Sequence, residues 1–245
     1  MANAQGQGGL ALAALLLSIG VALGGYFVGE GFYEGRRAER YVKVKGLAER
    51  PVRADVASWP LRFTAAANEL SVAQAQIDRY AELITDFLQK NGVPADDIQR
   101  QSLQVVDQLA QQYRQGAING NRFIITQTIE VRTSLVDEVE ALSRRTGELV
   151  SAGVVLSDAM GPTYSFTQLN AIKPEMIAEA TRNARASAEQ FAADAGSDVG
   201  EILRANQGVF QILPRAGADS YGMGEATQIE KRVRVVATLD FALSD

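Results

Sequence analysis

The chain has 245 residues and a net charge of −5, and none of its Lys/Arg runs is longer than two, which argues against a nucleic-acid partner. It contains no Cys and no His, which excludes disulfides, thiolate nucleophiles, His-dependent hydrolases and ordinary zinc sites. We therefore predict no cofactor, no metal and no enzymatic activity, and a site built from carboxylates or Tyr alone is the enzymatic alternative.

The first predicted element is an apolar run that carries no charge from Ala2 to Gly29. Residues 8–29 would form a helix of about 33 Å, close to the roughly 30 Å hydrocarbon core of a bilayer. No Lys or Arg precedes the run, and it is longer than the apolar stretch of a typical signal peptide. We predict that residues 1–38 are an uncleaved single-pass anchor with its juxtamembrane segment, and that residues 8–29 contact lipid.

Two alternatives for the apolar run remain open. A cleaved signal is compatible with the small-x-small site Ala22-Leu23-Gly24, and a buried core helix would need a polar edge that the run lacks. Small residues at four-residue spacing allow membrane helices to pack closely, although Gly is also frequent in membrane helices in general. We predict a helix–helix interface at Gly20, Gly24, Gly25 and Gly29.

The charges that follow the run bear on its orientation. Five basic residues lie after it and none before it: Arg36, Arg37, Arg40, Lys43 and Lys45. The positive-inside rule therefore places the C-terminal body in the cytoplasm.

The first half of the body alternates strands and a helix. Period-two alternation predicts two strands on either side of Pro51, with Pro51 and Pro60 at edges or bulges. A helix is predicted from Ser71 as N-cap to Gly92, and it has one apolar stripe. That stripe consists of Ile77, Tyr80, Ala81, Ile84, Phe87 and Leu88. Strands at 98–113 and 121–134 follow, joined by a turn at Asn119-Gly120. The second of these strands has one apolar face, formed by Phe123, Ile125, Ile129 and Val131.

The second half is predicted as helix, strand, helix and strand. A helix runs from about Ser134 to Gly153, a strand covers residues 163–172, and Pro174 is the first residue of the longest helix. The last strand, residues 231–243, has one apolar face, formed by Val233, Val235, Ala237, Leu239 and Phe241. Residues 39–245 therefore predict an α+β body in the order ββαββαβαββ, with helices packed on mostly antiparallel sheet.

Two features of the second half suggest contacts. Small residues form a narrow stripe that lets the longest helix sit close on a sheet: Ala180, Ala184, Ala188, Ala192 and Ala195. The last strand is long and carries little charge, so we predict that it lies at or near a free sheet edge and pairs with another chain, with a central position in its own sheet as the alternative. The candidate interface residues are Val233, Val235, Leu239 and Phe241, and the expected assembly is a homo-oligomer that closes into a ring.

Ordered Ala and Gly motifs carry a resemblance. They are Gly46, Ala48 and Ala54-Asp55, then Gly92 and Asp97-Ile98, then Glu179-Ala180, Arg182, Asn183-Ala184-Arg185, Ala188, Ala192, Gly196 and Val199-Gly200-Glu201-Ile202. Over about residues 41–243 the chain resembles the SIMPL-domain family of YggE-like proteins, formerly DUF541. Ala54 stands where the family usually has Pro, and the tyrosine-rich loop is shortened.

The resemblance implies an exported protein of the periplasm or cell envelope with no established catalytic activity, against the orientation that the basic residues predict. We predict a membrane-anchored, periplasm-facing scaffold or interaction protein of the bacterial inner membrane that associates with itself. The alternative is a soluble periplasmic stress-related binding protein released by cleavage near Gly24.

Overall fold

The computed structural model describes residues 17–29, 40–110, 120–157, 160–215 and 224–244, and the account below concerns these residues. Residues 17–29 are helical. The strands are β1 (Tyr41–Arg53), β2 (Val56–Ala67), β3 (Ile98–Arg100), β4 (Gln104–Asp107), β5 (Phe123–Thr133), β6 (Thr163–Ser165), β7 (Asp198–Gln207), β8 (Gln211–Pro214) and β9 (Glu230–Ser244). The helices are α2 (Leu70–Lys90), α3 (Val136–Ser143), α4 (Gly147–Ser151), α5 (Leu169–Ala195) and α6 (Gly224–Thr227), with a 3₁₀ turn at Ala95–Asp97.

Every strand pair with a defined register is antiparallel, and helices pack on the sheets, so the predicted α+β class is confirmed. The chain packs as two compact units, both built from discontinuous segments. Unit 1 takes the described residues within 1–48, 177–209 and 235–245, and unit 2 takes those within 49–176 and 210–234. That residues 39–245 are one domain stays a prediction.

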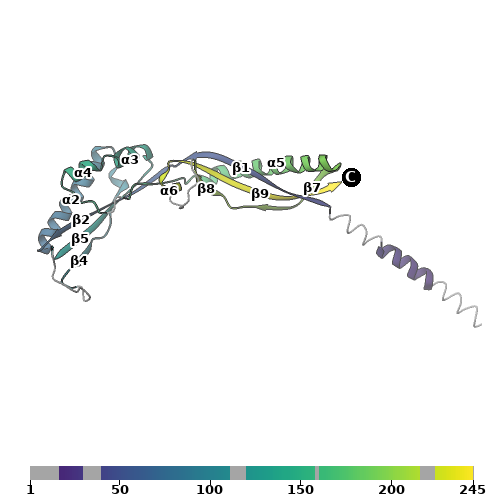
Figure 1. The fold of residues 1–245 in the computed structure, drawn as a ribbon, viewed down its shortest axis with the longest axis horizontal. Helices are drawn as coiled ribbons and strands as arrows, with labels where there is room; N and C mark the ends of the chain where they lie inside the picture. The colour runs from purple at the N-terminus through teal and green to yellow at the C-terminus, as the bar shows by residue number, and fades with distance from the viewer. Residues whose placement is uncertain (1–16, 30–39, 111–119, 158–159, 216–223, 245) are drawn as a thin grey trace, which may run out of the picture. The chain divides into compact units, whose positions relative to one another are not determined.

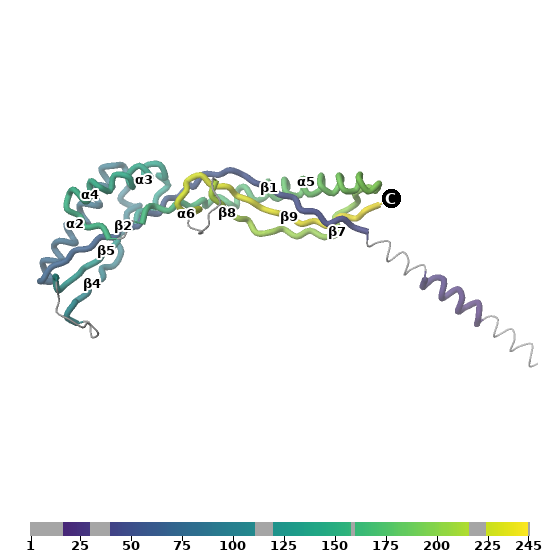
Figure 2. Tube along the Cα trace, viewed as in Figure 1, coloured from purple at the N-terminus to yellow at the C-terminus, as the bar shows by residue number. Residues whose placement is uncertain are grey.

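Unit 1 is a sheet in the order β1-β9-β7 with α5 on one face (Figures 1 and 2). The buried cluster between them contains Val44, Leu239 and Phe241 from the sheet and Ala184 and Ala188 from the helix. The predicted Ala stripe is confirmed at Ala180, Ala184, Ala188 and Ala192, which are at most 2% exposed. Ala195 is exposed and does not belong to it.

Helix α5 approaches β1 most closely at Gly46. A Cβ atom at this position would lie 1.8 Å from the Ala180 carbonyl oxygen and 2.5 Å from the Ala184 backbone nitrogen. Next to this contact, the Asn183 Nδ2 amide donates a 2.7 Å hydrogen bond to the Leu47 carbonyl oxygen. Because the atoms that would clash belong to the helix backbone, only glycine fits at position 46.

We expect Gly46→Ala to destabilise the protein by about 3 kcal/mol, the upper end of the cost of overpacking a core, because strand or helix must shift. Gly147→Ala is the matched control, since nothing lies within 4 Å of a Cβ there and Gly147 begins a helix. Urea unfolding of the two variants measures the difference. A Gly46→Ala variant as stable as Gly147→Ala would contradict this close contact.

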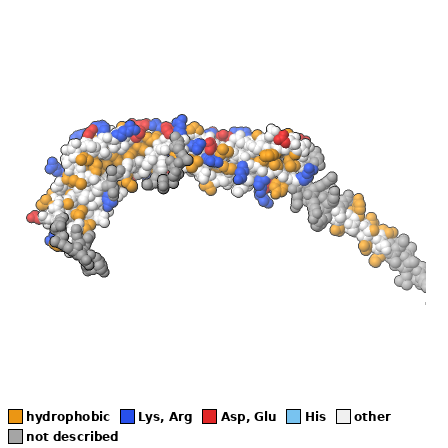
Figure 3. All heavy atoms as spheres, viewed as in Figure 1, with side chains coloured by type: hydrophobic (Ala, Val, Ile, Leu, Met, Phe, Trp, Pro, Cys, Tyr) orange, Lys and Arg blue, Asp and Glu red, His pale blue; other side chains and the backbone are white. Residues whose placement is uncertain are grey.

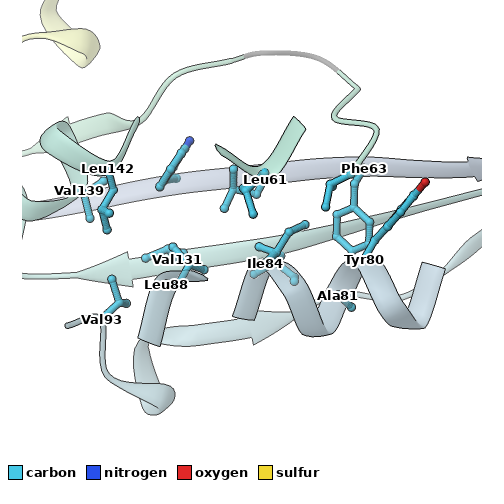
Figure 4. Close-up of a cluster of buried hydrophobic side chains, with 14 of the residues drawn as sticks. Leu61, Phe63, Tyr80, Ala81, Ile84, Leu88, Val93, Val131, Val139 and Leu142 are labelled. Carbon is cyan, nitrogen blue, oxygen red and sulfur yellow. The ribbon is translucent and has the colours of Figure 1, made fainter. Parts of the chain in front are cut away.

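Unit 2 is built on a second sheet in the order β3-β5-β2-β6, with β4 also paired to β5. Helix α2 packs on β2 and β5, and the predicted α2 stripe is confirmed, with Phe87 only partly buried. Figure 4 shows Leu61 and Phe63 of β2 close to Ile84 and Tyr80 of α2. The predicted apolar face of β5 is also confirmed, since Ile125, Ile129 and Val131 are fully buried and Phe123 packs against them.

The two strand prolines occupy positions where a missing N–H costs little. Pro51 lies in β1, at the end of its sheet, as predicted, but the predicted break at Pro51 is wrong, since β1 continues to Arg53. Pro60 lies inside β2, opposite Glu130 of β5. On the other side of β2, β6 pairs only with residues 56–58, and the next backbone bonds are those of Arg62 and Thr64. Pro60 therefore falls in the gap between two short pairings, beside a cavity of about 120 Å³.

Several predicted boundaries are wrong. Helix α2 begins before Ser71, because the Ala73 N–H already donates to the Glu69 carbonyl oxygen. The predicted helix at 134–153 is two helices, because i→i−3 bonds from Arg145 and Glu148 interrupt the helical ladder. Instead of one strand over 98–113, the described residues up to 110 form two short strands, β3 and β4. Residues 111–113 and Asn119 of the predicted turn lie outside the described residues.

The remaining errors concern the end of β6 and the start of the longest helix. Strand β6 ends at Ser165 instead of residue 172, because the Asp55 carboxylate accepts hydrogen bonds from the N–H and hydroxyl of Thr167 and turns the chain. Helix α5 then begins at Leu169, so Pro174 lies inside it and not at its first position. So near the N-terminus, a proline removes only one hydrogen bond, the one that the Asn170 carbonyl would accept.

Candidate interaction surfaces

The described N-terminal helix, residues 17–29, exposes apolar side chains in all directions. Its large apolar residues are 47–73% exposed: Leu17, Ile19, Val21, Leu23, Tyr26, Phe27 and Val28. Figure 3 shows this helix with hydrophobic side chains and no charged ones. A helix that is hydrophobic on every side is normally buried, either in a membrane or against other helices.

The four candidate glycines of this helix are open. No heavy atom lies within 4 Å of a Cβ placed at Gly20, Gly24, Gly25 or Gly29. Residues 8–16 and 30–38 of the predicted anchor and juxtamembrane segment lie outside the described residues. Within the part of the chain that the structure describes, no helix combines the length and the apolar character needed to span a membrane.

The candidate residues of the last strand are not at a free edge. Strand β9 lies between β1 on one side and β7 and β8 on the other, so the prediction of an edge position is wrong. Val233, Val235, Leu239 and Phe241 are at most 3% exposed within the chain itself. The strongly alternating sequence reflects a central strand whose apolar face is covered, which sequence alone does not distinguish from an edge strand.

The face of the unit 1 sheet that points away from α5 carries polar and charged side chains, and we call it the open face. From β1 it takes Tyr41, Lys43, Lys45 and Leu47, all exposed. From β9 it takes Thr238 and Asp240, and from β7 their cross-strand partners Asn206 and Arg204. The Lys43 Nζ atom lies 3.7 Å from an Asp240 carboxylate oxygen.

Unit 2 concentrates paired charges around Arg53. This guanidinium contacts the Asp137 carboxylate and lies 3.5 Å from the Glu230 carboxylate, which also contacts Arg215 at 3.3 Å. The hydrogen bond and charge of Asp137 raise the pKa of Arg53. Arg53, Glu140, Thr227 and Glu230 border a shallow pocket of about 420 Å³. Because Arg53 and Glu230 satisfy each other, these two groups are poorly suited to acid–base chemistry.

Tyr164 is the one titratable group with a large shift near this pocket among the described residues. It is only 5% exposed, and burial, followed by the charge of Glu140, raises the pKa of its phenol to about 12. The phenol therefore stays protonated near neutral pH. No group of three or more Asp or Glu residues within the described ranges could hold a metal ion. The absence of enzymatic activity stays a prediction.

Sequence reasoning missed the buried cation of unit 2. The Lys231 side chain is fully buried, and its ammonium donates to the backbone carbonyl and to the carboxylate of Glu225. The neighbouring Arg232 and Arg234 share the Glu49 carboxylate at 3.2 and 3.7 Å. The only sequence signal was the charge of Lys231 at a position where β9 alternates toward the core.

We expect the two halves of the Lys231–Glu225 pair to respond unequally to substitution. Glu225→Gln leaves a buried ammonium without its carboxylate and should cost about 3 kcal/mol, whereas Lys231→Met replaces the cation by an apolar side chain and should cost about 1 kcal/mol or less. Thermal and urea unfolding of the two variants measure both costs. An equal or reversed order would show that the buried charge does not require Glu225.

The comparison with protein families found one match. A family model described as SIMPL, a protein of unknown function (DUF541), matches residues 42–241. No curated protein matches the chain. The matched range begins in β1 and ends in β9, so it includes segments of both compact units.

Proposed function

Because the chain belongs to the SIMPL family through residues 42–241, we propose that it is a non-enzymatic interaction or scaffold protein of the bacterial cell envelope. In this proposal residues 8–29 hold the chain in the inner membrane as a single pass, the body faces the periplasm, and copies of the chain associate with one another. At the pocket of unit 2, Arg53 and Glu230 pair with each other, which leaves neither group free to act as an acid or base. This supports a binding role over a catalytic one.

The single observation that carries the anchor is the surface of residues 17–29. Seven large apolar side chains point in all directions from a helix without charge, and no part of the helix has a polar face that would suit water. Burying such a surface gains about 25 cal/mol per Å² of apolar area, and lipid is the environment that covers all sides at once.

Self-association is supported by the same helix. Gly20, Gly24 and the pair Gly25 and Gly29 are open at four-residue spacing, which lets two helix backbones approach within a membrane. The finding that β9 is central leaves the anchor as the predicted contact that is still available. A closed ring remains the form we favour, because closure satisfies every identical contact.

The proposed position of the body in the periplasm rests on the family match. The count of basic residues after the apolar run predicts the opposite side. Two of the five basic residues, Lys43 and Lys45, are part of strand β1. Residues of a folded strand sit at fixed positions in the body, whereas the positive-inside rule is a statistical rule for loops next to the membrane. We therefore propose a periplasmic body.

A second candidate is a soluble periplasmic binding protein released by cleavage after Ala22-Leu23-Gly24. The small residues Ala22 and Gly24 favour it, because signal peptidase sites have small side chains at this spacing. The two candidates differ in the N-terminus of the mature chain.

Anchoring and sidedness are tested together in spheroplasts. We expect the full-length chain to sediment with membranes, to begin before Ala22, and to lose its body when protease is added from outside. A chain starting at Arg40, made inside the cell, is the protected control. Mature protein that begins between Leu23 and Glu30 would support the released form, and a body that resists external protease would place it in the cytoplasm.

Self-association through the helix is tested by mass measurement in mild detergent. We expect the full-length chain to form an oligomer, and Gly24→Ile to lower its stability at least tenfold, because a branched side chain separates the helix backbones. Ile19→Phe is the control, since at 100° per residue Ile19 lies on the side of the helix opposite the glycines and the change adds bulk there. A monomeric wild-type chain at micromolar concentration would refute self-association, and an unchanged Gly24→Ile oligomer would refute this interface.

A further inference from the structure

The open face of the unit 1 sheet has a distribution of charge that neither its packing nor the family match explains. Lys43, Lys45 and Arg204 lie across the middle of the face, and Asp240 is the carboxylate among them. Asp198, opposite Ser244, stands at the end of the same face. On this face three cations therefore stand against the carboxylates of Asp240 and Asp198, in a chain whose net charge is −5.

The cations of the open face are available to a partner. The Asp240 side chain is 9% exposed, whereas the Lys43 side chain beside it remains 53% exposed. Lys45 and Arg204 are exposed as well. The carboxylate therefore sits at the level of the sheet, and the basic groups reach beyond it on longer side chains that can extend toward an anionic surface.

Apolar side chains accompany the cations. Tyr41 and Leu47 bracket Lys43 and Lys45 on the same face of β1 and are 51% and 41% exposed. Tyrosine is enriched at membrane–water interfaces, where its ring lies among the headgroups and its hydroxyl stays hydrated. A face that combines Lys, Arg, Tyr and Leu fits a headgroup layer better than it fits bulk water.

The chain itself limits how far this face can be from a membrane. Residues 30–40 connect the described N-terminal helix to Tyr41, and eleven residues span at most about 40 Å when fully extended. If residues 8–29 are in the bilayer, β1 is tethered within that distance of the lipid surface. The tether keeps the local concentration of lipid high, so even weak contacts are populated.

We propose that the open face, through Lys43, Lys45 and Arg204, docks on the anionic headgroups of the membrane that holds the anchor. This inference rests on the anchoring proposed above, and its partner is the lipid surface, not a soluble anion or another protein. Each basic residue close to an anionic bilayer contributes about 1 kcal/mol, so loss of one should lower the ratio of docked to undocked chains about fivefold.

The experiment uses the full-length chain in vesicles of phosphatidylcholine, with and without phosphatidylglycerol. The protein has no Cys, so Asn206→Cys labels the open face, and Ala186→Cys on the exposed side of α5 is the matched control. We measure quenching of an attached fluorophore by lipids with a quencher in the headgroup. We expect stronger quenching at position 206 than at position 186. This difference should appear only in vesicles that contain phosphatidylglycerol, and added salt should reduce it.

Charge reversal separates docking from proximity. Lys45→Glu should reduce quenching at position 206 about fivefold or more, whereas Arg182→Glu on exposed α5 should leave it unchanged. Equal quenching at both label positions, quenching without phosphatidylglycerol, or insensitivity to Lys45→Glu would overturn the docking. Loss of flotation with the vesicles would overturn the anchor and this inference with it, whereas flotation without quenching at position 206 overturns this inference alone. Free phosphate that abolishes quenching at constant ionic strength would identify a soluble anion site instead.

Discussion

Unit 1 depends on the contact between one glycine and one helix backbone. Gly46 lets α5 approach until a Cβ atom would lie 1.8 Å from the Ala180 carbonyl oxygen. At that separation only alanines fit along the helix, which is why the buried stripe repeats every four residues from Ala180 to Ala192. The same approach places Asn183 where its amide satisfies the Leu47 carbonyl oxygen of β1. The weakly specific Ala and Gly motifs of the family thus have a concrete packing role in this chain.

The cores of the two units are packed with side chains of different size. Unit 2 fills its interior with large side chains such as Trp59, Phe63 and Ile84 and keeps its charges in mutual pairs. Unit 1 uses small side chains at the helix and leaves the opposite sheet face with Lys43, Arg204 and exposed Tyr41. In unit 1, charged and exposed apolar side chains therefore lie together on the sheet face opposite the helix.

Periodicity predicted the parts of the fold in which one face is buried. The stripe of α2, the face of β5 and the face of β9 were all correct, because alternation or helical spacing records burial directly. The errors lie where a single tertiary contact overrides a local signal. Asp55 ends β6 early by binding Thr167, and Pro174 lies inside α5 near its N-terminus, where it removes only one helical hydrogen bond. Neither the Asp55–Thr167 contact nor the start of α5 ahead of Pro174 can be recognised from the sequence.

The candidate interface was predicted less well, and for a related reason. Whether a strand is central or at an edge depends on its neighbours, and for β9 these are β1 and β7, which lie far away in the sequence. Lys231 was missed because a long cation in an alternating strand normally points to water, and its carboxylate partner comes from the separate helix α6. The open glycines of residues 17–29 were visible in sequence because they depend only on helical spacing.

The pairing of β1 with β9 also dictates when the protein can fold. The first strand of the body has as its neighbour the last strand of the chain, and Phe241 closes the cluster under α5 only a few residues from the C-terminus. While the chain emerges from the ribosome, β1 and the Ala-rich helix have no sheet to join. Unit 1 is therefore completed only after β9 has been synthesised, so its core depends on contacts between segments far apart in the sequence, and such contacts form slowly because loop closure must come first.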